Sequence, residues 1–354
     1  IQVYCWAQRM YGKFAAFTSL TLFAFSPTVI AHSRFVTTDV PALFGILLAS
    51  SLFLRYLYRP TKRNLFFAGI GFGVAMLAKF STFLLIPYFL ILTLVYGLNK
   101  RPKWLNVKKS TIGTILIFII GFVLIVWPVY YLFTFNYPPE RQLADTEQIL
   151  GSFGNKTLVG LNVWMADKPV IRALGQYMLG LLMVGQRAVG GNTVYFLGEV
   201  SSEGWKHYFP VVYALKEPLP WLVLLMFSLL FLAWQVRLGK LKFQITNFIK
   251  NHFVEFAMIL WVAIYWATSI KSNLNIGVRH LLPTYPFAII LVSGQLARLK
   301  HKFKYFAGIV VLLLAWYVVE NIKAWPHYLS YFNQLSFLRP SWATEGQAGG
   351  GYLY

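Results

Sequence analysis

The sequence contains few of the residues that soluble enzymes and metal proteins commonly use. It has one cysteine, Cys5, so it can form no disulfide within this chain and no multi-cysteine metal site. Only 12% of its residues are charged, which is too few for a soluble globular domain of ordinary composition. There is no HExxH motif, no Cys/His ligand spacing and no phosphate-binding loop. Zinc hydrolysis and nucleotide binding therefore have no support in the sequence.

Long apolar runs dominate what is present. Hydrophobic residues make up 58% of the 354 residues, and the mean hydropathy is +0.58. Because a bilayer span needs roughly 20 mostly apolar residues, we expect an integral membrane protein with several spans. The candidate spans lie near residues 14–31, 42–57, 65–78, 82–98, 112–134, 218–236, 253–270, 284–297 and 305–320.

The distribution of charge predicts the orientation of these spans. The net charge of +21 could suggest nucleic acid, but the basic residues lie in membrane-flanking turns and form no continuous stripe, so we expect no nucleic-acid partner. When loops are assigned alternately to two sides, 19 of the 32 basic residues fall on one side, which the positive-inside rule makes cytoplasmic. All acidic residues except Glu255 then lie on the other, exoplasmic side.

The spans and loops divide the chain into four parts. Residues 1–134 and 218–320 hold the N-terminal and C-terminal transmembrane helices, and residues 321–354 begin an exoplasmic C-terminal segment. Residues 135–217 form one long exoplasmic loop, too rich in aromatic and apolar residues to be disordered. Its segment between Arg172 and Arg187 is apolar for only about 14 residues, so we expect a helix at the membrane surface or over the transmembrane core.

Polar residues in three connections are candidates for chemistry. The stretch "HSRFVTTDVP" carries His32, Arg34 and Asp39 between two apolar spans, where they could form part of a site or simply cap the next helix. Lys79 is the only charge between Leu65 and Leu98, and it could be a snorkelling anchor. Arg279 precedes a span with two prolines.

Together these side chains are suited to a phosphate at headgroup depth. Arg34 and Arg279 could bind it in bidentate fashion, each with a histidine nearby, His32 and His280 respectively. The Asp39 carboxylate could accept a proton from an attacking hydroxyl or help to hold a divalent metal. The sequence does not decide between these two roles.

Several longer stretches resemble a known family. "YGKFAAFTSLTLFAFSPTVIAHSRFVTTDVPALF", "GVRHLLPTYPF" and "PHYLSYFNQL" look like bacterial and archaeal membrane glycosyltransferases related to protein O-mannosyltransferases and aminoarabinose transferases, which form glycosyltransferase family 39. The stretch "YFLGEVSSEGWKHYFPVVYALKEPLP" is also similar to the segment that follows the large exoplasmic loop of that family. The resemblance implies an all-α polytopic membrane protein, a GT-C-type transmembrane helix bundle whose large exoplasmic loop carries interfacial helices.

The resemblance also implies an activity. It implies sugar transfer from a polyprenyl-phosphate carrier to a hydroxyl of a protein, lipid or polymer acceptor, on the exoplasmic side of the plasma or inner membrane and with inversion. By resemblance, Asp39 matches an acidic residue near the reaction centre, and Arg279 and His280 match a polar pair that faces the lipid phosphate. Lys79 is carried over as a further basic residue, and Tyr285 of the same "RHLLPTYPF" motif belongs to the expected donor-binding set.

The resemblance carries an expectation about the ends of the sequence. The first span and the first exoplasmic loop of the family, whose acidic motif supplies the proposed catalytic base, would precede Ile1, and relatives continue beyond "GGGYLY". We therefore expect this stretch alone to be inactive.

Two other functions remain open at the level of sequence. In a transporter or flippase, the same basic residues would bind a phosphorylated lipid in transit and leave its sugar–phosphate bond intact. In a structural membrane subunit, Lys79 and Arg279 would only be snorkelling anchors. Asn155 opens an "NKT" sequon, which we attribute to chance.

Overall fold

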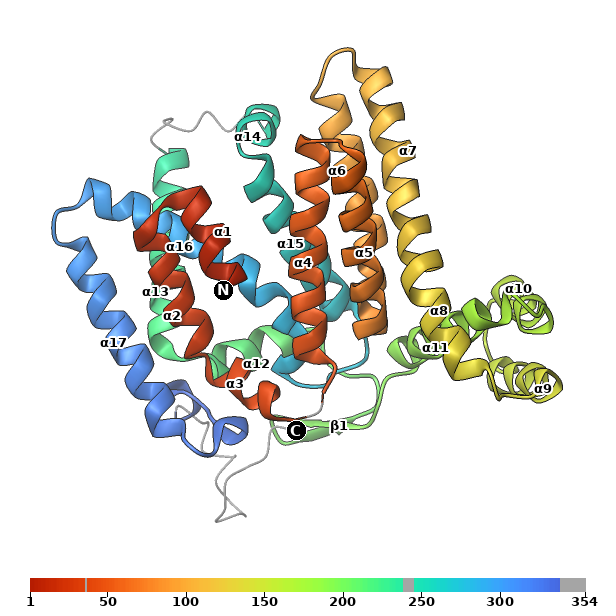
Figure 1. The fold of residues 1–354 in the computed structure, drawn as a ribbon. Coiled ribbons are helices and arrows are strands. Elements are labelled where there is room, and N and C mark those ends of the chain that lie inside the picture. Colours follow the sequence, from red (N-terminus) through yellow and green to blue (C-terminus); the bar gives the residue numbers. More distant parts are fainter. Residues whose placement is uncertain (36, 238–244, 338–354) are drawn as a thin grey trace. The chain divides into compact units, whose positions relative to one another are not determined.

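The protein is an all-α, multi-pass membrane protein, as the sequence predicts. The computed structural model describes residues 1–35, 37–237 and 245–337. Within these residues six helices are long and apolar enough to cross a membrane, or eight if each of two bent helix pairs is one span. The chain divides into two compact units, which are described separately below (Figure 1). The four-part division by membrane placement stays a prediction.

The first unit contains residues 1–43, 193–271 and 275–354. Its described elements are α1 (Gln2–Tyr11), α2 (Lys13–Ala24), α3 (Pro27–Arg34), the start of α4 (Asp39–Tyr58), β1 (Val194–Phe196), β2 (Glu199–Ser201), α12 (Tyr208–Lys216), α13 (Leu219–Arg237), α14 (Ile245–Asn251), α15 (Phe253–Lys271), η3 (Val278–Thr284), α16 (Tyr285–Lys302), α17 (Phe306–Ala324), η4 (Tyr328–Ser330) and η5 (Gln334–Phe337). The two strands form one antiparallel hairpin.

Helix α16 is the central element of the first unit. It contacts α1, α2, α13, α15 and α17. Its buried Ile289 and Leu296, together with Leu282 of the preceding η3 turn, join one apolar cluster with residues of α2, α12, α13 and α17. This packing brings segments that are far apart in the sequence into one core.

The first predicted span, residues 14–31, is broken into two helices. Helices α2 and α3 meet at an angle of 52°. Ser26 is the N-cap of α3, because its hydroxyl accepts a hydrogen bond from the Val29 amide at 3.3 Å, and Pro27 follows at the first helical position. A start signal inside an apolar run therefore redirects the chain, which hydropathy alone did not reveal.

A sharper corner separates α12 from α13. The two helices meet at 116°, and Glu217 and Pro218 form the connection. The ring of a proline disfavours helical backbone at the residue before it, and Glu217 is accordingly extended, with φ −90° and ψ 139°. The corner fixes Lys216 and Glu217 between two helix ends.

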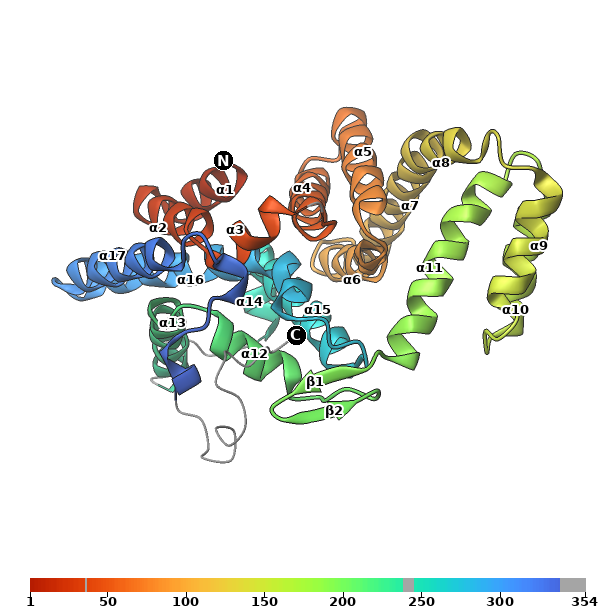
Figure 2. The same cartoon turned by 90° about the horizontal axis from the view of Figure 1, so that it is seen from below.

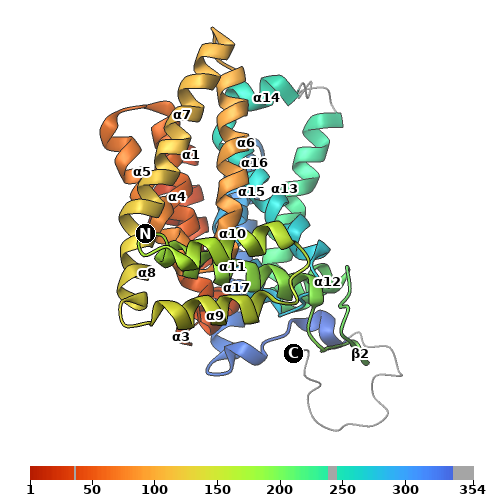
Figure 3. The same ribbon diagram turned by 90° about the vertical axis from the view of Figure 1, so that its right-hand side faces the viewer.

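The second unit contains residues 44–192 and 272–274. Its elements are the remainder of α4, α5 (Lys62–Ala78), η1 (Phe80–Leu84), α6 (Leu85–Leu98), α7 (Lys103–Gly121), the π-helical turn η2 (Phe122–Val126), α8 (Trp127–Thr134), α9 (Pro139–Leu150), α10 (Lys156–Asp167) and α11 (Arg172–Gly190). Helix α7 runs beside α5 and α6 (Figure 3). Helix α5 has 17 residues and is about 25 Å long, shorter than the hydrocarbon core of a bilayer.

Three helices of the long 135–217 insertion pack on one another. Helices α9, α10 and α11 lie side by side (Figure 2). Helix α11 coincides with the amphipathic segment that the sequence singled out, and its Arg172 is buried with one guanidinium nitrogen 3.0 Å from the Thr134 carbonyl oxygen. The placement of α11 at the membrane surface stays a prediction.

Glycines allow α5 and α7 to approach closely. A Cβ atom added to Gly73 would lie 2.7 Å from the Gly121 carbonyl oxygen and 2.6 Å from Cβ of Ile125. A Cβ atom on Gly121 would lie 2.9 Å from the Gly69 carbonyl oxygen. The glycines therefore serve helix packing, as in other small-residue motifs of membrane helices.

We expect Gly73→Ala to lower the free energy of unfolding by about 1–3 kcal/mol, because the added methyl group overpacks this contact. Gly160→Ala in α10 is the control, since no heavy atom lies within 4 Å of its added Cβ. Scanning fluorimetry of both variants in nanodiscs measures the difference. Equal melting temperatures would contradict the packing role.

Candidate functional site

Polar segments from distant parts of the sequence converge in the first unit. Helix α3 contacts both η3 and η4, and α12 contacts η3. Helix α3, which includes His32 and Arg34, therefore packs against η3, which includes Arg279 and His280. The structure thus brings together two of the three connections that the sequence singled out.

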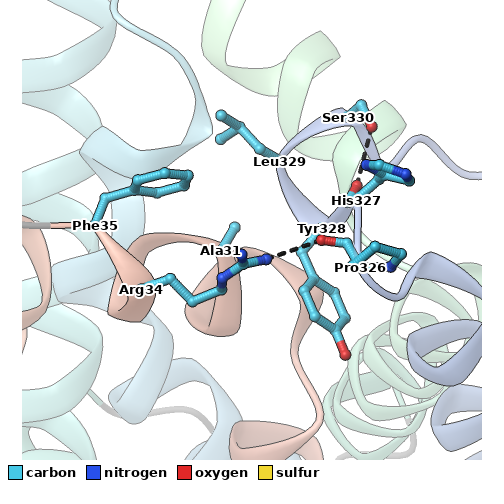
Figure 4. A pocket seen from close by; sticks show the side chains of 8 residues that line it. All are labelled: Ala31, Arg34, Phe35, Pro326, His327, Tyr328, Leu329 and Ser330. Atoms are coloured by element: carbon cyan, nitrogen blue, oxygen red, sulfur yellow. Dashed lines mark hydrogen bonds between the residues drawn. The ribbon is translucent and has the colours of Figure 1, made fainter.

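Arg34 lies at the edge of an open cavity. One of its guanidinium nitrogens, Nη1, donates to the Pro326 carbonyl oxygen at 2.9 Å (Figure 4). The cavity has a volume of about 350 Å³ and is lined by Ala31, Arg34, Phe35, Pro326, His327, Tyr328, Leu329 and Ser330. A guanidinium has five N–H donors, so the exposed Arg34 can hold this bond and also receive an anionic or hydroxyl-bearing ligand.

His32 and Asp39 are close in the sequence to the cavity residue Arg34, but both of their side chains are buried. His32 is 7% exposed within α3, and Asp39 is 4% exposed at the first position of α4. A carboxylate in the first turn of a helix is stabilised by the helix dipole. The helix-start role considered for Asp39 is thus compatible with its position, and its catalytic role stays a prediction.

The irregular η3 turn holds Arg279 and His280. Gly277 precedes the turn with φ +88°, a conformation that favours glycine, and Pro283 interrupts regular helix within it. Arg279 Nε donates to the Ile276 carbonyl oxygen at 3.2 Å. The His280 ring lies 5.5 Å from the Phe209 ring and 5.5 Å from that of Tyr265. Aromatic packing therefore fixes the imidazole of His280.

Tyr285 makes a contact that the sequence did not suggest. Its hydroxyl donates to Oε1 of Glu217 at 2.5 Å, and the Thr28 hydroxyl donates to the same oxygen at 2.8 Å. Glu217 is 2% exposed. Sequence reasoning counted Glu217 only among the exoplasmic acids, although an isolated glutamate just before an apolar span was a usable signal.

The C-terminal segment adds a second buried carboxylate. Glu320 of α17 accepts hydrogen bonds from Trp316 at 3.1 Å, from Gln334 at 3.0 Å and from Tyr331 at 3.3 Å. Burial and the Glu320 carboxylate raise the pKa of Tyr331 above its ordinary value. The phenol therefore remains a hydrogen-bond donor at neutral pH.

Lys79 belongs to the second unit. It follows α5 in extended conformation, and its carbonyl oxygen accepts a hydrogen bond from the Thr82 hydroxyl at 2.6 Å. The end of α5, which precedes Lys79, packs against α4 near Gly45. A Cβ atom added to Gly45 would lie 2.9 Å from Cα of Ala75. A shared surface of Lys79 with the residues of the first unit stays a prediction.

The described residues contain no group of three or more His, Cys, Asp and Glu side chains that could hold a metal ion. Asp39 as one ligand of a divalent metal remains a prediction that this observation does not test.

Fold and site together define a class, a polytopic helical membrane protein in which the arginine-bearing segments α3 and η3 of the first unit pack against each other. Residues 1–127 match the family model described as dolichyl-phosphate-mannose-protein mannosyltransferase. Neither the curated proteins nor the solved structures include a match to the chain. The matched residues contain α3 and Asp39 from the site, and they also contain Lys79.

We expect Tyr285→Phe to lower the free energy of unfolding by about 1.5–3 kcal/mol, because a buried carboxylate loses a donor. Thermal melting in nanodiscs measures the loss. Tyr305→Phe is the control, since the Tyr305 side chain is exposed. An unchanged melting temperature together with weaker lipid binding would instead assign the Tyr285 hydroxyl to the ligand.

Proposed function

We propose that the protein is a glycosyltransferase that moves a sugar from a polyprenyl-phosphate carrier to an acceptor hydroxyl. The match of residues 1–127 to the mannosyltransferase family model supports the reaction class. The resemblance of "GVRHLLPTYPF" and "PHYLSYFNQL", which lie outside the matched residues, extends this support to η3 and η4.

The observation that carries the proposal is the packing of α3 against η3. Arg34 ends α3 and Arg279 lies within η3, so this packing supports a shared phosphate site for two arginines that are far apart in the sequence. Guanidinium groups recognise phosphate through parallel N–H donors and keep their charge at any physiological pH. Two arginine side chains at membrane depth cost free energy unless they have an anionic partner. An anionic lipid head group is a suitable partner.

The proposed reaction is a single displacement. The acceptor oxygen attacks the anomeric carbon while the bond from that carbon to the phosphate oxygen breaks, which inverts the configuration. The departing polyprenyl phosphate takes the electron pair, and Arg279 stabilises its growing negative charge. The acceptor proton passes to a carboxylate, and Asp39 is the residue of this chain that we assign near the reaction centre, either as that acceptor or as a metal ligand.

The location of the site is part of the proposal. The positive-inside assignment puts the connection with Asp39 and the turn with Arg279 on the exoplasmic side of the plasma or inner membrane. His32, Arg34, His280 and Tyr285 complete the proposed donor-binding set with Arg279, and Lys79 stays a separate prediction. A protein, lipid or polymer hydroxyl could serve as acceptor.

Two substitutions in the full-length gene product test the proposal. Arg279→Ala should weaken donor binding about 10- to 100-fold, because charged hydrogen bonds are worth about 1.5–3 kcal/mol. Asp39→Asn should leave binding nearly unchanged and lower turnover about 10²- to 10⁴-fold, as for loss of a general base. Release of free polyprenyl phosphate in nanodiscs, followed by mass spectrometry with a panel of donors, measures both.

Lys103→Ala is the control for loss of positive charge, because Lys103 is exposed at the start of α7, on the side assigned as cytoplasmic. Wild-type activity of both site variants would refute the residue assignment. Binding of every donor without cleavage, in the presence of a broad acceptor mixture, would favour a flippase over a transferase.

A further inference from the structure

We infer that Lys216 and Glu217, at the corner between α12 and α13, are positioning residues that hold the walls of the Arg34 cavity and the start of α16 in register. This inference rests on the proposed function for its kinetic consequence. Its structural part is independent of any activity. Neither residue belongs to the donor-binding set proposed above, and neither lines the cavity.

The Glu217 side chain joins three segments of the chain. Its Oε1 atom accepts from Thr28 of α3 at 2.8 Å and from Tyr285 of α16 at 2.5 Å. The two donors lie 189 and 68 residues away in the sequence. Because Glu217 is almost fully buried, loss of its carboxylate leaves both hydroxyl donors without this acceptor in an apolar environment.

The same corner holds the segment after α17. Lys216 Nζ donates to the Leu329 carbonyl oxygen at 3.0 Å and lies 3.7 Å from the centroid of the Phe332 ring. Asn333 donates through Nδ2 to the carbonyl oxygens of Ala214 and Glu217, both at 2.6 Å, and its amide donates to the Leu215 carbonyl oxygen at 2.9 Å. The η4 turn is therefore fixed from the corner.

These contacts meet at the cavity. One wall is the C-terminal end of α3, and Glu217 holds the start of this eight-residue helix through Thr28. The other wall is η4, which Lys216 holds through Leu329. The Arg34 bond to the Pro326 carbonyl oxygen spans the two walls. Through Tyr285, Glu217 also fixes the first residue of α16, which directly follows the turn of Arg279 and His280. One dipeptide thus sets the spacing between the Arg34 cavity and Arg279.

Glu320 provides a matched control. It is similarly buried, at 5% exposed, and its donors Trp316, Tyr331 and Gln334 lie only 4, 11 and 14 residues away. It therefore stabilises a local part of the chain, whereas Glu217 connects distant parts. Glu217→Gln is the conservative variant, because an amide oxygen can still accept from Thr28 and Tyr285.

The first experiment measures amide hydrogen exchange of the full-length protein in nanodiscs. Glu217→Ala should speed exchange at least tenfold in both residues 27–34 and residues 285–290, as expected for loss of a buried charged hydrogen bond. Glu217→Gln should retain most of the protection. Glu320→Ala should speed exchange near residues 316–334 and leave residues 285–290 unchanged. Thr28→Val, which removes one donor without changing the shape, serves if Glu217→Ala does not fold, and should speed exchange in residues 27–34.

The second experiment measures donor KM and kcat of the same variants. Glu217→Ala should raise KM about tenfold through misplaced donor-binding groups, and Glu217→Gln should restore KM. Glu320→Ala loosens only the η4 wall of the cavity, so it should raise KM clearly less at a comparable loss of melting temperature.

Each arm can overturn the inference separately from the proposed function. Unchanged exchange in residues 27–34 and 285–290 of folded Glu217→Ala would refute the positioning role whatever the activity. Equal KM changes in Glu217→Ala and Glu320→Ala would reduce Glu217 to a stability residue. A failure of glutamine to rescue KM while exchange is restored would also contradict positioning. Absence of sugar transfer by the wild type would refute the proposed function and leave the exchange result standing.

Discussion

Burial of polar side chains in an apolar helical unit is the constraint on which the site depends. A carboxylate removed from water must be hydrogen-bonded, because an unsatisfied buried charge costs several kcal/mol. Glu217 meets this requirement with donors from α3 and α16, and Glu320 meets it with donors from its own neighbourhood. The difference between distant and local donors gives the two glutamates different effects on the geometry of the first unit.

Backbone irregularity supplies the places where these polar groups can gather. The break at Ser26 and Pro27, the corner at Pro218 and the turn around Gly277 and Pro283 each interrupt an apolar helix. At such interruptions, side chains and neighbouring turns satisfy backbone groups that regular helix would otherwise pair. All three interruptions lie in the first unit, and the segments α3 and α12 both contact η3.

In the second unit, small residues and helix packing dominate over polar contacts. Its glycines serve close packing of α5 and α7, and its insertion helices α9, α10 and α11 pack on one another. Its buried Arg172 donates a hydrogen bond to the Thr134 carbonyl oxygen at the end of α8, so this charge stabilises helix packing within the same unit. The candidate chemistry of this unit is limited to Lys79, whose role remains a prediction.

Hydropathy, charge distribution and turn residues determined the all-α membrane fold, because each depends only on neighbours along the chain. Every predicted span is largely helical, although residues 14–31 are divided between α2 and α3, and the segment from Arg172 is helical as expected. To predict the break within residues 14–31, Ser26 would have had to be recognised as a helix N-cap inside an apolar run. The partners of Tyr285 and Arg34 could not be predicted, since they lie 68 and 292 residues away. Only tertiary packing decides such contacts, because a polar side chain pairs with whichever donor or acceptor the fold brings within about 3 Å.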